Sequence, residues 1–334
     1  MGVNAFFVLS GFLITSLLLR EYGRSGRIAL GRFYLRRVIR LFPPLLAVIV
    51  AVTLYSLFVP GAVRSEESLT GTLPAFFYFS NWVRAFTEDA TPLGLYEHTW
   101  SLSVEEQFYI LWPLVLWAVL RITRRLWAVV VVSLIGCMGS LMVRFVVEPG
   151  VDGARIYNGF DTEADQLLFG CALAALILWA EMGSWGHRLG RGLAWALLPA
   201  VGVIAVAAFT WDSGHSSARA FVSMTVIAVA FAVTVGTLYL NPQNPLSRVL
   251  ATKPFVYIGK RSYALYLWHY PIFTVMQMTL VPSNGPLRMA IQFALSLLAA
   301  ELSWRLIEVP SGRLKDRLTG GKKASAPNGV HLIG

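Results

Sequence analysis

Long runs of apolar residues, separated by short polar segments, recur along the whole chain. Each run is close to the roughly 17–25 residues that a helix needs to cross a bilayer core. The runs do not show the short alternating pattern of membrane barrels. They predict nine transmembrane helices, at about 3–20, 41–60, 104–121, 126–147, 165–181, 193–211, 219–239, 262–281 and 287–307. We therefore expect an all-α, polytopic integral membrane helix bundle.

The segment Leu73–Val83 is apolar but too short for a span, and we expect it to be interfacial or re-entrant. Composition supports the membrane interpretation: 56% of the residues are hydrophobic and only 14% are charged. Soluble domains carry about 25% charged residues.

The polar segments alternate in charge. Residues 20–40 carry seven arginines against one glutamate, and 121–125, 248–261 and the C-terminal tail are also basic, whereas 60–103 and 148–165 are acidic. The positive-inside rule then places the basic loops and the tail in the cytoplasm and the N-terminus outside. The net charge of +10 thus reflects topology rather than nucleic-acid binding. We expect a membrane domain over 1–312 and a basic, disordered cytoplasmic tail over 313–334.

The string HTWSLSVEEQFYILWP, His98–Pro113, lies where an outer loop enters a span. Ser103 and Glu106 fit a capping box, which would put Glu105 in the first helical turn. A histidine and a carboxylate at this position could do acid–base chemistry. The alternative is that the glutamates only cap the helix and that His98 is a solvated loop residue.

The string SYALYLWHYPIF, Ser262–Phe273, places His269 inside an apolar span, where ionisable groups are costly. Ser262, Tyr266 and His269 share one helix face, and Pro271 is expected to kink the helix beyond them. The alternative to a functional role is a neutral histidine satisfied by a nearby hydroxyl.

The string GRFYLRRVIRLFPP, Gly31–Pro44, repeats arginine every four residues, and Pro43 and Pro44 are expected to open the next span. Guanidinium groups at a cytoplasmic surface could hold the phosphates of an anionic donor. The alternative is ordinary topology and attraction to anionic lipids.

Other features are structural expectations. Glu301, Arg305 and Glu308 have the spacing of self-neutralising pairs. The cysteines Cys137 and Cys171 lie in apolar runs, so we expect packing residues rather than a disulfide. No metal-ligand spacing is visible, and we expect no metal ion.

Taken together, the motifs resemble the bacterial membrane acyltransferase-3 family. The matching strings occur in order over about residues 2–312: FFVLSGFLI, FYLRRVIRLFPP, HTWSLSVEEQFYILWP, DTEADQLLFGCALA, VYIGKRSYALYLWHYPIF and LSWRLIEVP. The resemblance implies an O-acyltransferase of the bacterial plasma (inner) membrane. Its donor would be an acyl-CoA, typically acetyl-CoA, and its acceptor a hydroxyl of a carbohydrate or glycolipid.

The motifs and the resemblance together identify candidate site residues. Catalytic candidates are Glu105, Tyr266 and His269; donor-binding candidates are Arg36, Arg37, Arg40, Ser10 and Gly11; acceptor-side candidates are His98, Trp100 and Ser101.

Two departures from the family pattern stand out. The family usually has ten spans, and its first carries a histidine thought to be catalytic; no residue here matches it, so this chain is expected to lack that helix. Glu163 in DTEAD stands where an arginine is common in the family.

A transporter or flippase for a lipid-linked sugar and a catalytically inactive relative are the alternatives. The acceptor, the acyl chain length and the oligomeric state stay open.

Overall fold

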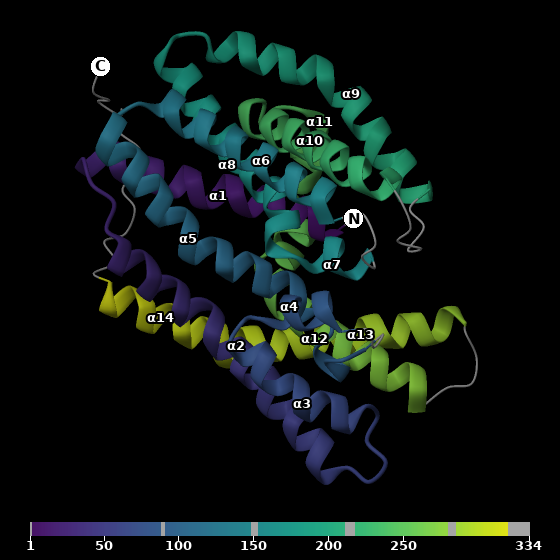
Figure 1. The fold of residues 1–334 in the computed structure, drawn as a ribbon. Helices are drawn as coiled ribbons and strands as arrows, with labels where there is room; N and C mark the ends of the chain where they lie inside the picture. Colours follow the sequence, from purple (N-terminus) through teal and green to yellow (C-terminus); the bar gives the residue numbers. More distant parts are fainter. Residues whose placement is uncertain (1, 88–90, 148–152, 211–217, 280–284, 320–334) are drawn as a thin grey trace. The chain divides into compact units, whose positions relative to one another are not determined.

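The computed structural model describes residues 2–87, 91–147, 153–210, 218–279 and 285–319. All regular structure in these ranges is helical, which confirms the all-α prediction (Figure 1). The elements are α1 (Gly2–Ser25), α2 (Leu30–Phe58), α3 (Ser65–Phe76), α4 (Ser80–Phe86), the 3-10 turn η1 (Gly94–Tyr96), α5 (Thr99–Thr123), α6 (Leu126–Val147), α7 (Gly153–Asn158), α8 (Phe160–Met182), α9 (Gly186–Thr210), α10 (Ala218–Leu240), α11 (Pro245–Leu250), α12 (Lys253–Thr279), α13 (Pro286–Ser303), the π-helical turn η2 (Trp304–Glu308) and α14 (Val309–Leu318).

Each of the nine predicted spans falls on a helix. Within the described residues, six helical stretches are long and apolar enough to cross a membrane: Gly2–Ser25, Leu30–Phe58, Leu126–Val147, Gly153–Met182, Gly186–Phe209 and Pro286–Leu318. The three remaining predicted spans correspond to α5, α10 and α12. The chain is therefore a multi-pass membrane protein.

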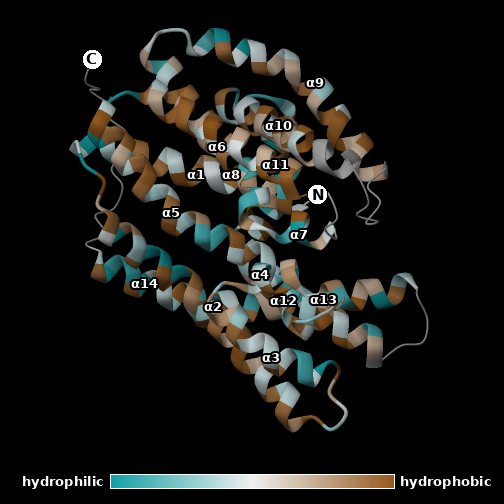
Figure 2. Cartoon of the chain, in the orientation of Figure 1, coloured by the Kyte–Doolittle hydropathy of each residue, from teal (hydrophilic) through white to brown (hydrophobic). Residues whose placement is uncertain are grey.

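The outer surface of α9 shows how far the structure depends on a lipid environment. After a start that carries His187, Arg188 and Arg191, the helix is largely hydrophobic (Figure 2). Trp195 is 85% exposed and Leu198 is 81% exposed. An apolar face of this kind is unusual on a soluble monomer, whereas lipid tails cover it without cost.

The chain divides into two compact units. Unit 1 contains Met1–Ile28 and Val104–Leu250, and unit 2 contains Ala29–Ser103 and Ala251–Ala326. Helix α5 begins in unit 2 and continues in unit 1.

Unit 1 is organised by close packing of α1 against α8. A Cβ atom on Gly11 would lie 1.9 Å from the carbonyl oxygen of Leu167, and one on Gly170 would lie 2.0 Å from that of Val8. Glycine at both positions lets the two backbones meet, which is how membrane helices commonly associate. Cys171 donates to the carbonyl of Gly11 at 3.4 Å, and both cysteines are free and buried, as predicted.

Unit 2 is built around α2. Its buried residues Leu45 and Val48 pack with Leu93 and Tyr96 of the η1 region and with Leu267 of α12. The Tyr96 hydroxyl donates to the carbonyl of Ile49 at 3.1 Å.

Three local features refine the expectations from the sequence. Helix α2 begins at Leu30 and runs through Pro43 and Pro44, the residues expected to mark the entry to a span; membrane helices tolerate internal proline where other groups satisfy the freed carbonyls. The segment Leu73–Val83 is split between α3 and α4, with Tyr78 at φ 56° in the break. The predicted disordered tail starts inside α14, so 313–318 are helical, and 320–334 lie outside the described residues.

Candidate functional site

The predicted acceptor-side residues converge in unit 2, where the start of α5 meets α12. The Tyr266 hydroxyl of α12 donates to the backbone carbonyl of His98, which directly precedes α5. The same hydroxyl lies 2.5 Å from Oγ of Ser101 in the first turn of α5. Trp100, beside Ser101, is buried. The hydroxyl of Tyr266 therefore fixes the point at which the loop becomes a helix.

His269 is oriented by its own helix. Its Nδ1 lies 2.6 Å from the backbone carbonyl oxygen of Tyr266. A carbonyl oxygen can only accept a hydrogen bond, so Nδ1 carries the proton in the neutral ring. The lone pair is then on Nε2, which is the tautomer that a histidine needs to act as a base through Nε2.

His98 is buried among aromatic rings rather than solvated. Its ring centroid lies 5.4 Å from that of Tyr266, 5.6 Å from that of His269 and 5.1 Å from that of Tyr270. Burial, with a smaller contribution from the charge of His269, lowers the pKa of His98 to about 3. His98 is therefore neutral at physiological pH.

Glu97 anchors the loop before His98. Its carboxylate accepts a hydrogen bond from the backbone N–H of Leu93 at 2.6 Å and lies 3.2 Å from the Arg84 guanidinium. Burial raises the pKa of Glu97, and the charge of Arg84 opposes that shift. These contacts hold η1 and the following histidine in a defined position.

The predicted donor-binding arginines lie on the first half of α2. Arg36 and Arg37 are half-buried, and Arg40 is exposed. The carboxylate of Glu308 in η2 lies within electrostatic range of Arg40. The neighbouring Tyr263 hydroxyl of α12 donates to the Leu41 carbonyl at 2.8 Å, which joins α12 to this part of α2.

A second cluster joins α12 to α13 and η2. Glu301 accepts hydrogen bonds from Arg261 and Arg305, which confirms the predicted pairing of Glu301 with Arg305 and adds Arg261. The Arg261 guanidinium also lies over the Tyr257 ring, 3.5 Å from its centroid, and over the Trp304 ring, 4.2 Å from its centroid. On α12, Arg261 and His269 are about 12 Å apart along the axis at the usual rise of an α-helix.

In unit 1, three side chains from two of the predicted motifs meet. Glu105 of α5 is 2% exposed, and one of its oxygens accepts hydrogen bonds from Ser10 of α1 and from Tyr109. The capping-box prediction was wrong: α5 begins at Thr99, and Ser103 donates to the Thr99 carbonyl. Glu105 is thus held by side chains in the second turn rather than by a helix N-terminus.

The DTEAD segment also finds its positive partner in unit 1. Arg144 of α6 forms a fully buried ion pair with Asp165 and donates to the Thr162 carbonyl at 2.5 Å and to Oγ1 of Thr225 at 2.9 Å. Glu163 accepts from Gln166. The resemblance leads one to expect an arginine at 163, where this chain has Glu163, and the buried arginine of this cluster belongs to α6.

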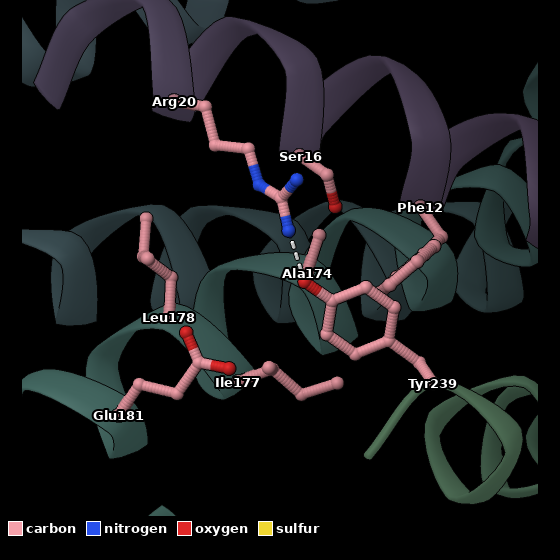
Figure 3. Close-up of a pocket in the computed structure, with 8 residues that line it drawn as sticks. All are labelled: Phe12, Ser16, Arg20, Ala174, Ile177, Leu178, Glu181 and Tyr239. Atoms are coloured by element: carbon pink, nitrogen blue, oxygen red, sulfur yellow. Dashed lines mark hydrogen bonds between the residues drawn. The ribbon is translucent and has the colours of Figure 1, made fainter. Parts of the chain in front are cut away.

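Figure 3 shows a small pocket in unit 1, outside these clusters. Its apolar wall includes Phe12 and Ile177, and its polar rim includes Arg20 and Glu181. Arg20 donates to the Tyr239 hydroxyl. Of the predicted site residues, none lines this pocket.

Two residues of these clusters were missed from the sequence. Arg144 is a lone arginine inside an apolar run, and an intramembrane charge is a signal that could have identified it. Tyr270 stacks on His98, and no spacing rule points to it. Among the described residues, no group of three or more His, Cys, Asp or Glu side chains could hold a metal ion.

Comparison with known proteins adds the family. A family model described as an acyltransferase domain matches residues 1–304. Three relatives resemble most of the chain. Peptidoglycan O-acetyltransferase OatA of Listeria monocytogenes is 34% identical over 323 residues, covering 92% of this chain and 50% of that protein. O-acetyltransferase OatA of Staphylococcus aureus is 34% identical over 337 residues, covering 93% and 52%.

Putative peptidoglycan O-acetyltransferase YrhL of Bacillus subtilis is 32% identical over 330 residues, covering 92% of this chain and 50% of that protein. The chain spans about half the length of the curated relatives it matches. No solved structure matches it.

Proposed function

The chain belongs to the membrane acyltransferase-3 family, and on that basis we propose that it is a membrane O-acetyltransferase. The acceptor would be a hydroxyl group of peptidoglycan or a related cell-envelope glycan. The match over residues 1–304 carries this proposal, together with the similarity to peptidoglycan O-acetyltransferases over most of the chain.

For the reaction we propose acyl transfer from a thioester, with acetyl-CoA as donor. The acceptor hydroxyl oxygen attacks the carbonyl carbon of the thioester while its proton moves to a base. The carbon–sulfur bond breaks, and the thiolate leaves and is protonated. His269 is the proposed base, because the carbonyl of Tyr266 holds its Nδ1 proton and leaves the lone pair on Nε2.

The phosphates of the donor would be held on the first half of α2 in unit 2, by Arg36, Arg37 and Arg40. Guanidinium groups match phosphate geometry, and Arg36 and Arg37 lie one turn of α2 before Arg40, so the three provide several donors close together. Helix α12 links this region to His269, since Tyr263 contacts α2 beside Arg40 and His269 lies further along the same helix. An extended donor could therefore lie along α12 with its thioester toward the histidine.

We further propose that the arginine region faces the cytoplasm and the His98 region faces outward, as the loop charges indicate. Glu105, buried in unit 1 beside Ser10 and Tyr109, is a separate candidate for acid–base chemistry.

Mass spectrometry of cell-wall glycans tests the proposal. Deleting the gene should remove a mass increment of one acetyl group from glycan fragments, and restoring it should return the increment. A variant with His269→Gln should fail to restore it while accumulating in the membrane at the normal level. Unchanged glycan acetylation in the deletion strain would refute the function.

A further inference from the structure

His98 is a buried polar side chain whose ring has no satisfied nitrogen. It is 7% exposed, and neither Nδ1 nor Nε2 has a hydrogen-bond partner within the described part of the chain. The Leu267 backbone lies near the ring but does not reach hydrogen-bond geometry. Leaving a buried donor and acceptor without partners is costly and uncommon in native proteins, so the position calls for an explanation.

The groups around His98 do not satisfy its ring. The stacked Tyr270 ring, tilted by 23°, offers an aromatic face. The Tyr266 hydroxyl is already engaged with the carbonyl of His98 and with Ser101. Nδ1 of His269 is engaged with the Tyr266 carbonyl. The imidazole of His98 is therefore surrounded by aromatic rings and keeps its hydrogen-bonding capacity available. Small-molecule sites typically combine an apolar lining with a few such polar groups.

The chemistry of the neutral ring narrows the class of ligand. A neutral imidazole offers one N–H donor and one acceptor nitrogen, and a hydroxyl group can both accept and donate. A hydroxyl can therefore pair with either nitrogen in either tautomer.

Resting on the proposed function, we propose that a ring nitrogen of His98 binds a hydroxyl group of the saccharide acceptor and thereby positions the sugar beside His269. Access requires one neighbour to move, and Tyr270 is suited to this. Tyr270 is half-buried. The one hydrogen bond recorded for its hydroxyl comes from Arg64 at 3.5 Å, which is long for a hydrogen bond and therefore costs little to break. His98 is thus a binding residue for the acceptor, distinct from the base.

The test uses the full chain reconstituted in lipid nanodiscs, with a glycan-strand fragment released from peptidoglycan by a muramidase as the acceptor. His98→Phe keeps an aromatic ring against Tyr270 but removes both nitrogens. His98→Gln keeps a donor and an acceptor. His187→Phe, on the exposed start of α9, is the matched control.

We expect His98→Phe to weaken binding of the fragment about tenfold, the loss of roughly one buried hydrogen bond. His98→Gln should retain most of the affinity, and His187→Phe should match the wild type. Without saccharide, the melting temperature of His98→Phe should equal or exceed that of the wild type, since an unsatisfied polar group has been replaced.

Other results separate the two proposals. Wild-type affinity in a folded His98→Phe protein would overturn the acceptor role and would point to an internal water as the partner of His98. A lower melting temperature of His98→Phe with unchanged affinity would make the residue purely structural and would also overturn it. Wild-type protein that binds the fragment but never transfers acetyl from acetyl-CoA would refute the proposed function while leaving the binding role of His98 intact.

Discussion

Replacing Arg144 with methionine is the most direct test of how unit 1 is held together. The Arg144 side chain is fully buried and makes an ion pair with Asp165 and further hydrogen bonds to Thr162 and Thr225. Methionine has similar length and no charge, so the change leaves the Asp165 carboxylate buried with one hydroxyl partner, Thr225.

The expected loss is large. Removing one partner of a buried ion pair typically costs about 3–5 kcal/mol, because the remaining charge stays desolvated. A loss of that size is a substantial fraction of the roughly 5–15 kcal/mol that stabilises a folded domain. Replacing both partners, as Arg144→Met with Asp165→Leu, should recover most of the loss because no charge is left behind.

Unfolding of the purified protein in mixed micelles, followed by tryptophan fluorescence against increasing denaturing detergent, measures these differences. Arg125→Met is the control, since Arg125 is exposed, and a change there should be within about 0.5 kcal/mol of the wild type. Two results would refute the reasoning: an Arg144→Met variant within about 1 kcal/mol of the wild type, or a double variant as unstable as the single one.

Three further predictions follow from other parts of the molecule. Replacing Arg37 and Arg40 together with alanine should abolish acyl transfer without lowering the amount of protein in the membrane, and retained transfer would exclude the donor role. The pKa of His98 is about 3 in the folded protein and 6.5 for the free group. Between these pH values the unfolded chain binds more protons than the folded one, so the free energy of unfolding falls as the pH drops below 6.5. The free energy of unfolding should be lower by about 2 kcal/mol at pH 5, and His98→Phe should not show this decrease. A melting temperature that falls equally with pH in the wild type and in His98→Phe would contradict the prediction. Gly11→Ala should reduce the yield of folded protein, because its Cβ would lie 1.9 Å from the α8 backbone, whereas Gly202→Ala has open space; equal yields would count against the close packing.

The hydropathy pattern was sufficient to predict the helices because bilayer thickness dictates their length. All nine predicted spans fall on helices. The local boundaries were harder. Pro43 and Pro44 were expected at the entry to a span, and α2 begins before them, at Leu30, and continues through them. The capping-box spacing suggested a start at Ser103, yet the helix begins at Thr99. At the start of α5 the Tyr266 hydroxyl of α12 donates to the His98 carbonyl, a contact from another helix that a local spacing rule does not include.

In the candidate site, too, the sequence predicted some features and could not predict others. Helical spacing predicted that Tyr266 and His269 share a face, but it could not show that Tyr266 reaches the carbonyl of His98, 168 residues away in sequence. Nor could it show that Ser10 reaches Glu105, 95 residues away. The residue types signalled chemistry, whereas their partners depend on how helices distant in sequence pack.

Helix α12 carries residues of two chemically different regions of unit 2, the cluster around Arg261 and the region around His269. Its first part carries Arg261, whose charge is paired with Glu301 and covered by two aromatic rings, so this arginine has a structural role. Its later part carries His269, whose proton is fixed by the helix's own backbone. Because a helix is stiff, the separation between the two regions is set by the number of residues between them. Inserting one residue between Tyr266 and His269 would rotate the histidine by about 100° and move it off the face it shares with Tyr266, so the length of this segment constrains the proposed chemistry as strictly as its residue types.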